Sequence, residues 1–210
     1  NHANPKAIII GDSHADSIIS SITAMYDLKK ESILVLTRAS CPYVLNAKNN
    51  KLDEACYKEN FERLKLLEKY KDIPIIIVGR WSAYLYGQSD PKRILNNDNR
   101  PPMYFGKNKY MTHKALISEF SKNLTETLCQ SSKHTKVFIT QPIPEMGRNI
   151  PDSLARLQVL GIKNIDLSIA SSQYYQKNKS LRQVITDAAI QCNVTVLDPA
   201  SILCNNNKCI

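Results

Sequence analysis

Five short apolar runs, rich in β-branched residues, are distributed along the chain, and each ends at a glycine or a polar residue. A continuous apolar run of this length is typical of a parallel strand that is buried on both faces. The runs predict strands at Ala7–Gly11, Ser32–Thr37, Ile73–Gly79, Lys136–Gln141 and Val194–Asp198.

Between these runs, apolar residues recur at helical spacing. They predict helices at Asp16–Lys30, Tyr57–Tyr70, Met111–Cys129 and Ile169–Cys192, with Thr112 as N-cap of the third and with a break in the fourth left open. Alternating strands and helices favour a parallel sheet with right-handed crossovers, and 210 residues fit one domain. We therefore expect an α/β fold in a single domain over residues 1–210: a three-layer α/β/α sandwich, flavodoxin-like, with a central parallel sheet of about five strands.

Two irregular stretches follow predicted strands. Gly87–Gly106 is polar and rich in Pro and Asn, and Gln141–Pro151, "QPIPEMGRNIP", is full of turn-forming residues. Both then lie at the carboxyl edge of the sheet, where open α/β sheets bind ligands.

The chain carries a formal net charge of +9. This charge indicates either a solvated surface with surplus lysine or an anionic partner, such as an acidic glycan or a membrane surface. We expect no nucleic-acid partner, because no Arg/Lys-rich helix, zinc-finger spacing or RNA-stacking pattern is present. No apolar run approaches the roughly 20 residues of a membrane helix, and "NHANPK" lacks the apolar segment of a signal peptide.

The six cysteines allow several pairings. Cys204 and Cys209 bracket the turn-forming "NNNK", and Cys41 and Cys56 bracket a loop-like stretch, so we expect two local disulfides and an oxidising compartment. Cys129 and Cys192 lie near the ends of predicted helices, where we expect buried thiols rather than a third pair. No CxxC or Cys/His cluster has metal-ligand spacing, so no metal site is predicted.

Candidate chemistry begins at the end of the first run, in "GDSH" (Gly11 to His14). One interpretation is a helix cap supplied by Asp12 or Ser13. The other uses the same turn for catalysis: an exposed Ser13 would be a nucleophile, and its backbone N–H would donate to an oxyanion.

This motif and four later segments resemble one family. The segments are "GDSH", "ASCPYV" with the following Cys56, "IIIVGRWSAY", "QPIPEMGRNIP" and "VLDPASILCNNNKC". In this order they are similar to the SGNH/GDSL hydrolase superfamily. In particular they resemble the periplasmic C-terminal SGNH domain of membrane-bound acyltransferases that O-acetylate bacterial surface polysaccharides.

The resemblance implies roles for individual residues. Ser13 matches the nucleophile that takes the acyl group, Gly79 falls where a second oxyanion donor is usual, and Arg80 and Trp81 would line the site. Asp12 and His14 flank the nucleophile, His14 in a supporting or substrate-contacting role. For Trp81, packing in the core is an equally good interpretation.

The chain departs from the family pattern at two places. The Gly-x-Asn-Asp block is absent, and Asn96, Asn97 and Asn99 lie in a different kind of loop, so Arg80 is a candidate to replace the missing oxyanion donor.

The Asp-x-x-His segment that carries the general base and its orienting carboxylate is also absent. The histidines His2, His14, His113 and His134 are all badly placed to serve Ser13, and Asp198 is a weak orienting candidate. We expect the catalytic Asp and His to lie outside this chain, which would be truncated before them.

The resemblance implies a periplasmic module, tethered to the bacterial inner membrane, that transfers an acetyl group through an acyl-Ser13 intermediate to a hydroxyl of a surface glycan. The partners would be the glycan, such as lipopolysaccharide, and a membrane-embedded acyltransferase domain that supplies the acyl group. No cofactor is implied. Two alternatives remain: a carbohydrate esterase using the same serine, and a glycan-binding module that lacks the catalytic base.

Overall fold

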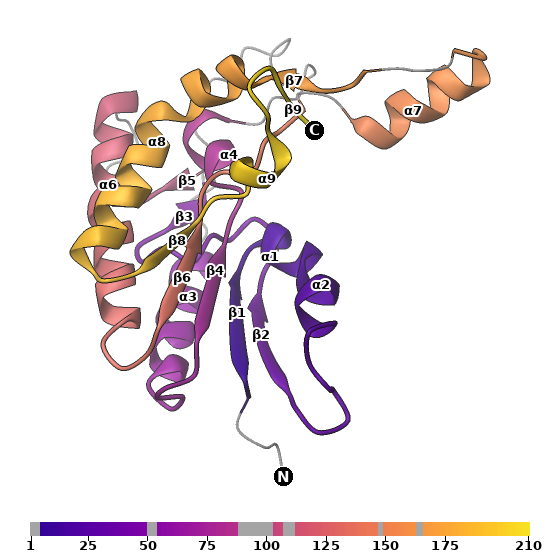
Figure 1. Cartoon of the computed structure of the whole chain (residues 1–210). Coiled ribbons are helices and arrows are strands. Elements are labelled where there is room, and N and C mark those ends of the chain that lie inside the picture. The colour runs from indigo at the N-terminus through magenta and orange to yellow at the C-terminus, as the bar shows by residue number, and fades with distance from the viewer. Residues whose placement is uncertain (1–4, 50–53, 88–102, 107–111, 147–148, 163–165) are drawn as a thin grey trace.

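A five-stranded parallel sheet forms the centre of the computed structural model, which describes residues 5–49, 54–87, 103–106, 112–146, 149–162 and 166–210 (Figure 1). The strand order is β2-β1-β4-β6-β8, with every neighbouring pair parallel. The strands are β1 (Ala7–Gly11), β2 (Ile33–Thr37), β4 (Ile75–Val78), β6 (Val137–Thr140) and β8 (Thr195–Leu197). All five predicted strands and the parallel sheet are confirmed.

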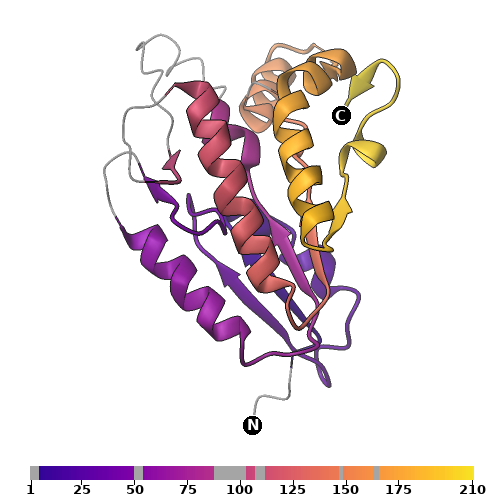
Figure 2. The same ribbon diagram turned by 90° about the vertical axis from the view of Figure 1, so that its left-hand side faces the viewer.

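Helices cover both faces of this sheet, which confirms the three layers (Figures 1 and 2). One face carries α1 (Ser13–Ser17) and α2 (Ile19–Thr23), and the other carries α3 (Ala55–Leu67), α6 (His113–Ser131) and α8 (Ser171–Gln191). Successive strand residues point to opposite faces. Ile8 and Ile10 therefore pack in the larger core under α3, α6 and α8, whereas Ile9 packs under α1 and α2.

The predicted helices differ from the observed ones mainly near the start of the chain. The helix expected over Asp16–Lys30 begins earlier, at Ser13, and is split at Ile18 into two short helices. Thr112 caps α6 as predicted, since its hydroxyl accepts a hydrogen bond from the backbone of Ala115. The long helix α8 is unbroken over 21 residues.

Shorter elements lie around the carboxyl edge of the sheet. They are α4 (Trp81–Tyr86), α7 (Ile150–Val159), α9 (Ala200–Leu203), the antiparallel pair β3 (Lys48–Asn49) and β5 (Met103–Tyr104), and the antiparallel pair β7 (Ile169–Ala170) and β9 (Lys208–Cys209). The irregular stretch Gly87–Gly106 falls largely outside the described residues. Among the helices that the structure describes, none is long and apolar enough to span a membrane.

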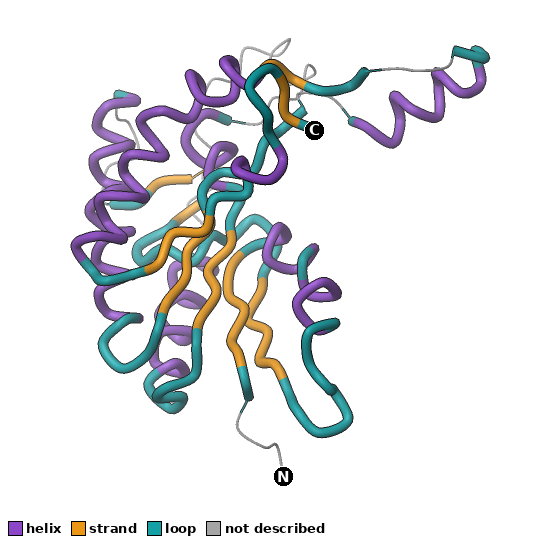
Figure 3. The backbone as a smooth tube through the Cα atoms, in the orientation of Figure 1, coloured by secondary structure: helices purple, strands orange, loops and turns teal. Residues whose placement is uncertain are grey.

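Helix α7 was not predicted, because its first residues overlap the turn-rich stretch that ends at Pro151. Asn149 caps it, and Pro151 occupies its first turn, where proline is tolerated. Figure 3 shows α7 extended away from the sheet, and none of its residues is buried.

All six cysteines are paired. The disulfides Cys41–Cys56 and Cys204–Cys209 confirm the two local pairs. The expectation of free thiols at Cys129 and Cys192 is wrong, because these two residues form a third disulfide. Both α6 and α8 run back to the amino edge of the sheet, so their C-terminal ends lie together and bring Cys129 and Cys192 into contact.

The long-range disulfide should stabilise the fold more than the local one at the C-terminus. In the loop-entropy account, Cys129–Cys192, with a separation of 63 residues, is worth about 4 kcal/mol. Cys204–Cys209, with a separation of 5, is worth about 2 kcal/mol. We therefore expect the double variant C129A/C192A to lose more unfolding free energy in urea than C204A/C209A. Equal losses, or unreduced peptides without a Cys129–Cys192 link in mass spectrometry, would contradict this assignment.

Candidate active site

The turn after β1 is pressed against the end of β4. Gly11 has φ of +154°, and a Cβ at this position would lie 1.8 Å from the carbonyl oxygen of Val78. Only glycine fits this approach. The turn therefore places Asp12 and Ser13 beside Gly79 and Arg80, the residues that follow β4.

Asp12 holds this turn through three hydrogen bonds. Its side chain is fully buried, and Oδ1 accepts from the backbone N–H of His14 at 2.7 Å. Oδ2 accepts from the backbone N–H of Arg80 at 2.7 Å and from the hydroxyl of Tyr84 at 2.6 Å. Asp12 is thus the N-cap of α1 and also joins the β1 turn to the β4 turn and to α4.

Ser13 is exposed at the start of α1, and no described residue forms a hydrogen bond with its hydroxyl. The cap and the exposed hydroxyl therefore belong to separate residues: Asp12 satisfies the helix terminus, and Ser13 faces solvent. As the first residue of the helix, Ser13 also has a backbone N–H without an acceptor in the preceding turn. Both groups remain available to a bound acyl group.

His14 lies on the same turn, with its side chain 29% exposed and its Nδ1 3.9 Å from Asp12 Oδ1. Burial lowers the pKa of His14 below its ordinary value, and the Arg80 charge acts in the same direction, while Asp12 and Glu145 partly oppose them. The imidazole is consequently largely neutral at pH 7, and no hydrogen bond joins it to the Ser13 hydroxyl.

Arg80 is fixed by a glutamate from the loop after β6. Its Nε donates to Glu145 Oε1 at 2.8 Å, and Lys177 Nζ lies 3.8 Å from Glu145 Oε2. The Arg80 side chain is 32% exposed, and no described residue accepts a hydrogen bond from its Nη groups. Arg80 can therefore present fixed N–H donors to an anion near the turn that carries Ser13.

Glu145 is the site residue that sequence reasoning missed. It belongs to the stretch Gln141–Pro151, which was predicted at the carboxyl edge of the sheet, but its pairing with Arg80 depends on how the loops after β4 and β6 approach one another. The available signals were an acidic residue in a turn-rich loop at that edge and the resemblance of this stretch to the family.

Trp81 does not line the site. It is fully buried, its Nε1 donates to the carbonyl oxygen of Thr140 at 2.9 Å, and its ring packs near Phe120. The core-packing interpretation of Trp81 is therefore correct. The same ring lies against Gly79, where a Cβ would approach it to 3.0 Å, so Gly79 keeps the backbone close to the tryptophan.

The remaining candidates lie apart from Ser13. His113 stacks near Tyr86 at the start of α6, and His134 precedes β6 at the amino edge of the sheet. Asp198 is held by Arg182 in a bidentate ion pair at 2.9 and 2.7 Å and caps Ala200, which confirms its role at a strand end.

His2, Asn96, Asn97 and Asn99 lie outside the described residues. Among the described residues, no group of three potential ligands could hold a metal ion.

The lowered pKa of His14 predicts a specific pH dependence of stability. Because the pKa is lower in the folded state, the unfolded state binds more protons, so stability is retained above pH 6.5 and falls as the pH drops below it. In urea unfolding, the wild type should therefore lose stability relative to His14→Gln between about pH 7.5 and about pH 5. His134→Gln, which removes an exposed imidazole, is the control. A wild-type advantage that grows toward pH 5 would contradict the burial of His14.

Comparison with known proteins found a family and a solved structure that this chain resembles. The model of a family described as "SGNH domain (fused to AT3 domains)" matches residues 1–210. Among solved structures, the periplasmic domain of a lipopolysaccharide acetyltransferase from Salmonella ser. Paratyphi A matches with a TM-score of 0.62 and 13% identity, covering 100% of this chain and 72% of that one. No curated protein sequence matches. The chain belongs to the family of SGNH domains that are fused to AT3 domains.

Proposed function

We propose that this chain is the SGNH module of an O-acetyltransferase and that Ser13 carries the acyl group. The observation that supports this most strongly is the division of roles on the β1 turn: Asp12 takes the whole capping function, and Ser13 is left exposed at the carboxyl edge of the sheet. The fusion to AT3 domains that characterises the family supplies a membrane acyltransferase as partner.

In the proposed reaction, Ser13 Oγ attacks the carbonyl carbon of an acetyl donor, and the donor group leaves with a proton. The acetyl-serine ester is then attacked by a glycan hydroxyl, which restores Ser13. The negative charge on the carbonyl oxygen would be stabilised by the Ser13 backbone N–H, the Gly79 backbone N–H and the Arg80 guanidinium. Arg80 would thus replace the Gly-x-Asn-Asp donor that the sequence lacks.

The base that removes the Ser13 proton is proposed to come from outside residues 1–210. No described histidine is bonded to Ser13: His14 follows Ser13 directly but forms no hydrogen bond with its hydroxyl, His113 stacks near Tyr86, and His134 lies at the opposite edge of the sheet. This same observation favours the second candidate, a glycan-binding module without catalysis. The esterase alternative differs only in the acceptor, which would be water.

The proposed location is the periplasm, with the module tethered to the inner membrane by the acyltransferase domain. The three disulfides support an oxidising compartment. The proposed acceptor is a surface glycan such as lipopolysaccharide.

Replacing the nucleophile tests the proposal directly. In the natural protein that contains this chain, Ser13→Ala should lower O-acetylation of the cell's own surface glycan by at least about a hundred-fold. Ser17→Ala is the matched control, because Ser17 lies on the same short helix and bonds only the carbonyl oxygen of His14. If the glycan stays acetylated in Ser13→Ala, the nucleophile is wrong. If acetate is released from the glycan instead of added, the esterase alternative is correct.

A second prediction concerns Tyr84, which acts on Ser13 only through Asp12. Tyr84→Phe removes the 2.6 Å hydrogen bond to Asp12 Oδ2 and should lower O-acetylation by about ten-fold through misplacement of the turn.

Tyr43→Phe is the control for Tyr84→Phe, because Tyr43 is equally buried and its hydroxyl bonds Ser131, away from the turn. Tyr43→Phe should cost about 1 kcal/mol of unfolding free energy and Tyr84→Phe about 2 kcal/mol, because the Tyr84 bond is made to a charged group. Equal activity losses in the two variants would show that Tyr84 contributes stability alone.

A further inference from the structure

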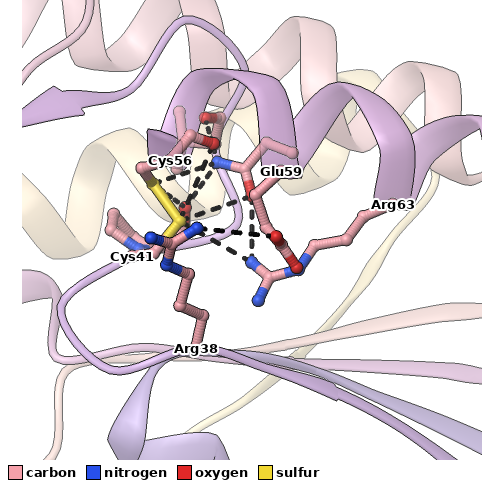
Figure 4. Close-up of polar contacts among 8 residues, drawn as sticks. Arg38, Cys41, Cys56, Glu59 and Arg63 are labelled. Atoms are coloured by element: carbon pink, nitrogen blue, oxygen red, sulfur yellow. Dashed lines mark hydrogen bonds and ion pairs between the residues drawn. A yellow bond between two sulfur atoms is a disulfide. The ribbon is translucent and has the colours of Figure 1, made fainter. Parts of the chain in front are cut away.

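Two arginines share a single glutamate where β2 ends. Glu59 on α3 lies between the guanidinium groups of Arg38 and Arg63 (Figure 4). Its Oε2 is 3.6 Å from Arg38 Nη1, and its Oε1 is 3.4 Å from Arg63 Nε. The three side chains carry a net charge of +1, so one carboxylate neutralises only half of the positive charge.

Arg63 is buried, yet part of its guanidinium group has no hydrogen-bond partner in the described part of the chain. Its side chain is only 3% exposed, and Nη1 donates to Asn60 Oδ1 at 3.0 Å, but neither Nε nor Nη2 has a hydrogen-bond partner among the described residues. Burial lowers the pKa of this guanidinium, which reports the cost of holding its charge there. A buried guanidinium normally has its donors satisfied by an anion.

Glu59 is the anion that faces the Arg63 guanidinium, but its contacts are long. Its side chain is 41% exposed, and both of its ion contacts are longer than the 2.7–2.9 Å of a charge-assisted hydrogen bond. An exposed glutamate on a helix can change rotamer without disturbing the backbone. Glu59 therefore has the properties of an internal anion that another anion can displace.

The surrounding structure holds the two arginines in place. The Cys41–Cys56 disulfide joins the loop after β2 to α3, and Asn60 Nδ2 donates to the carbonyl oxygens of Pro42 and Val44 at 2.8 Å each. Figure 4 shows this disulfide beside Arg38, and Arg63 Nη1 lies 3.8 Å from Cys41 Sγ. Because this frame fixes both arginines, they can bind an anion between them with little rearrangement.

This cluster adjoins the turn that carries Ser13. The backbone N–H of Arg38 donates to the carbonyl oxygen of Gly11 at 3.1 Å, two residues before Ser13. Thr37, which pairs with Gly11 in the sheet, donates to Asp16 on α1. A group bound by Arg38 is therefore on the same edge of the sheet as the proposed nucleophile.

We propose that Arg38 and Arg63 form a subsite for an anionic group of the acceptor, a carboxylate or a phosphate, which displaces Glu59. The inference deepens the proposed function, because it names the acceptor as an acidic glycan whose charged group is held at the same edge of the sheet as Ser13. The planar guanidinium groups match the two oxygens of either anion. The net charge of +9 would favour approach of such a polymer.

Binding of small anionic sugars to the purified chain tests the subsite without any acyl donor. The probes are trigalacturonate for carboxylate, mannose 6-phosphate for phosphate and maltotriose as the neutral control, titrated by calorimetry at one low ionic strength. Arg38→Gln should weaken binding of the preferred anion about ten-fold, whereas Glu59→Gln should tighten it several-fold by removing the internal competitor. Which of the two anions binds more tightly identifies the group.

Arg156→Gln is the matched control, because it removes one exposed arginine charge on α7, away from the cluster. It should leave the affinity within about two-fold, since only long-range attraction changes. Arg63→Gln is not a suitable variant, because Arg63 is buried and its replacement would disturb folding as well as binding. Opposite effects of the Arg38 and Glu59 variants support the subsite.

Three results would overturn the inference. They are no binding of either anion by the wild type, unchanged or weaker binding in Glu59→Gln, and equal weakening in Arg38→Gln and Arg156→Gln. None of these depends on whether Ser13 forms an acyl intermediate. Loss of the subsite and failure of the proposed function can therefore be told apart.

Discussion

The buried carboxylate of Asp12 is the interaction on which the site depends. It accepts three hydrogen bonds, from the backbone of His14, the backbone of Arg80 and the hydroxyl of Tyr84. These donors come from the turn after β1, the turn after β4 and helix α4, so one side chain sets the relative position of three segments. A fully buried carboxylate is tolerable only with such complete pairing, and breaking it would leave a charge without compensation.

The same constraint explains how a short helix terminus becomes a candidate active site. Because Asp12 satisfies the first turn of α1, Ser13 is not needed as a cap and its hydroxyl stays exposed. Arg80 is anchored twice, through its backbone by Asp12 and through its side chain by Glu145, so the guanidinium is fixed near the turn that carries the serine. The loops after β1, β4 and β6 thus contribute one element each to a single arrangement at the carboxyl edge of the sheet.

Sequence patterns predicted the parts of the fold that depend on local composition. The continuous apolar runs located all five sheet strands, with β1 matching at both ends, because residues buried on two faces leave little choice of residue type. Features that depend on tertiary proximity were missed. The pairing of Cys129 with Cys192 requires α6 and α8 to be neighbours, and Glu145 reaches Arg80 only when two loops meet. The position of Trp81 was undecided because a tryptophan after a buried strand fits a core and a cleft equally well, and its hydrogen bond to Thr140 resolves that choice.

The most direct test of the account is to look for the acyl group on Ser13 in the natural protein and in its Asp12→Asn variant. An asparagine is the same size but turns one acceptor into a donor, so it cannot accept all three hydrogen bonds. We predict that mass spectrometry of peptic peptides finds an acetyl group on Ser13 in the wild type. We also predict that the group is at least about ten-fold less abundant in Asp12→Asn, while circular dichroism shows both proteins folded. Equal acetylation in the two proteins, or acetyl on another residue with Ser13 unmodified, would contradict the claim that Asp12 positions Ser13 as the nucleophile.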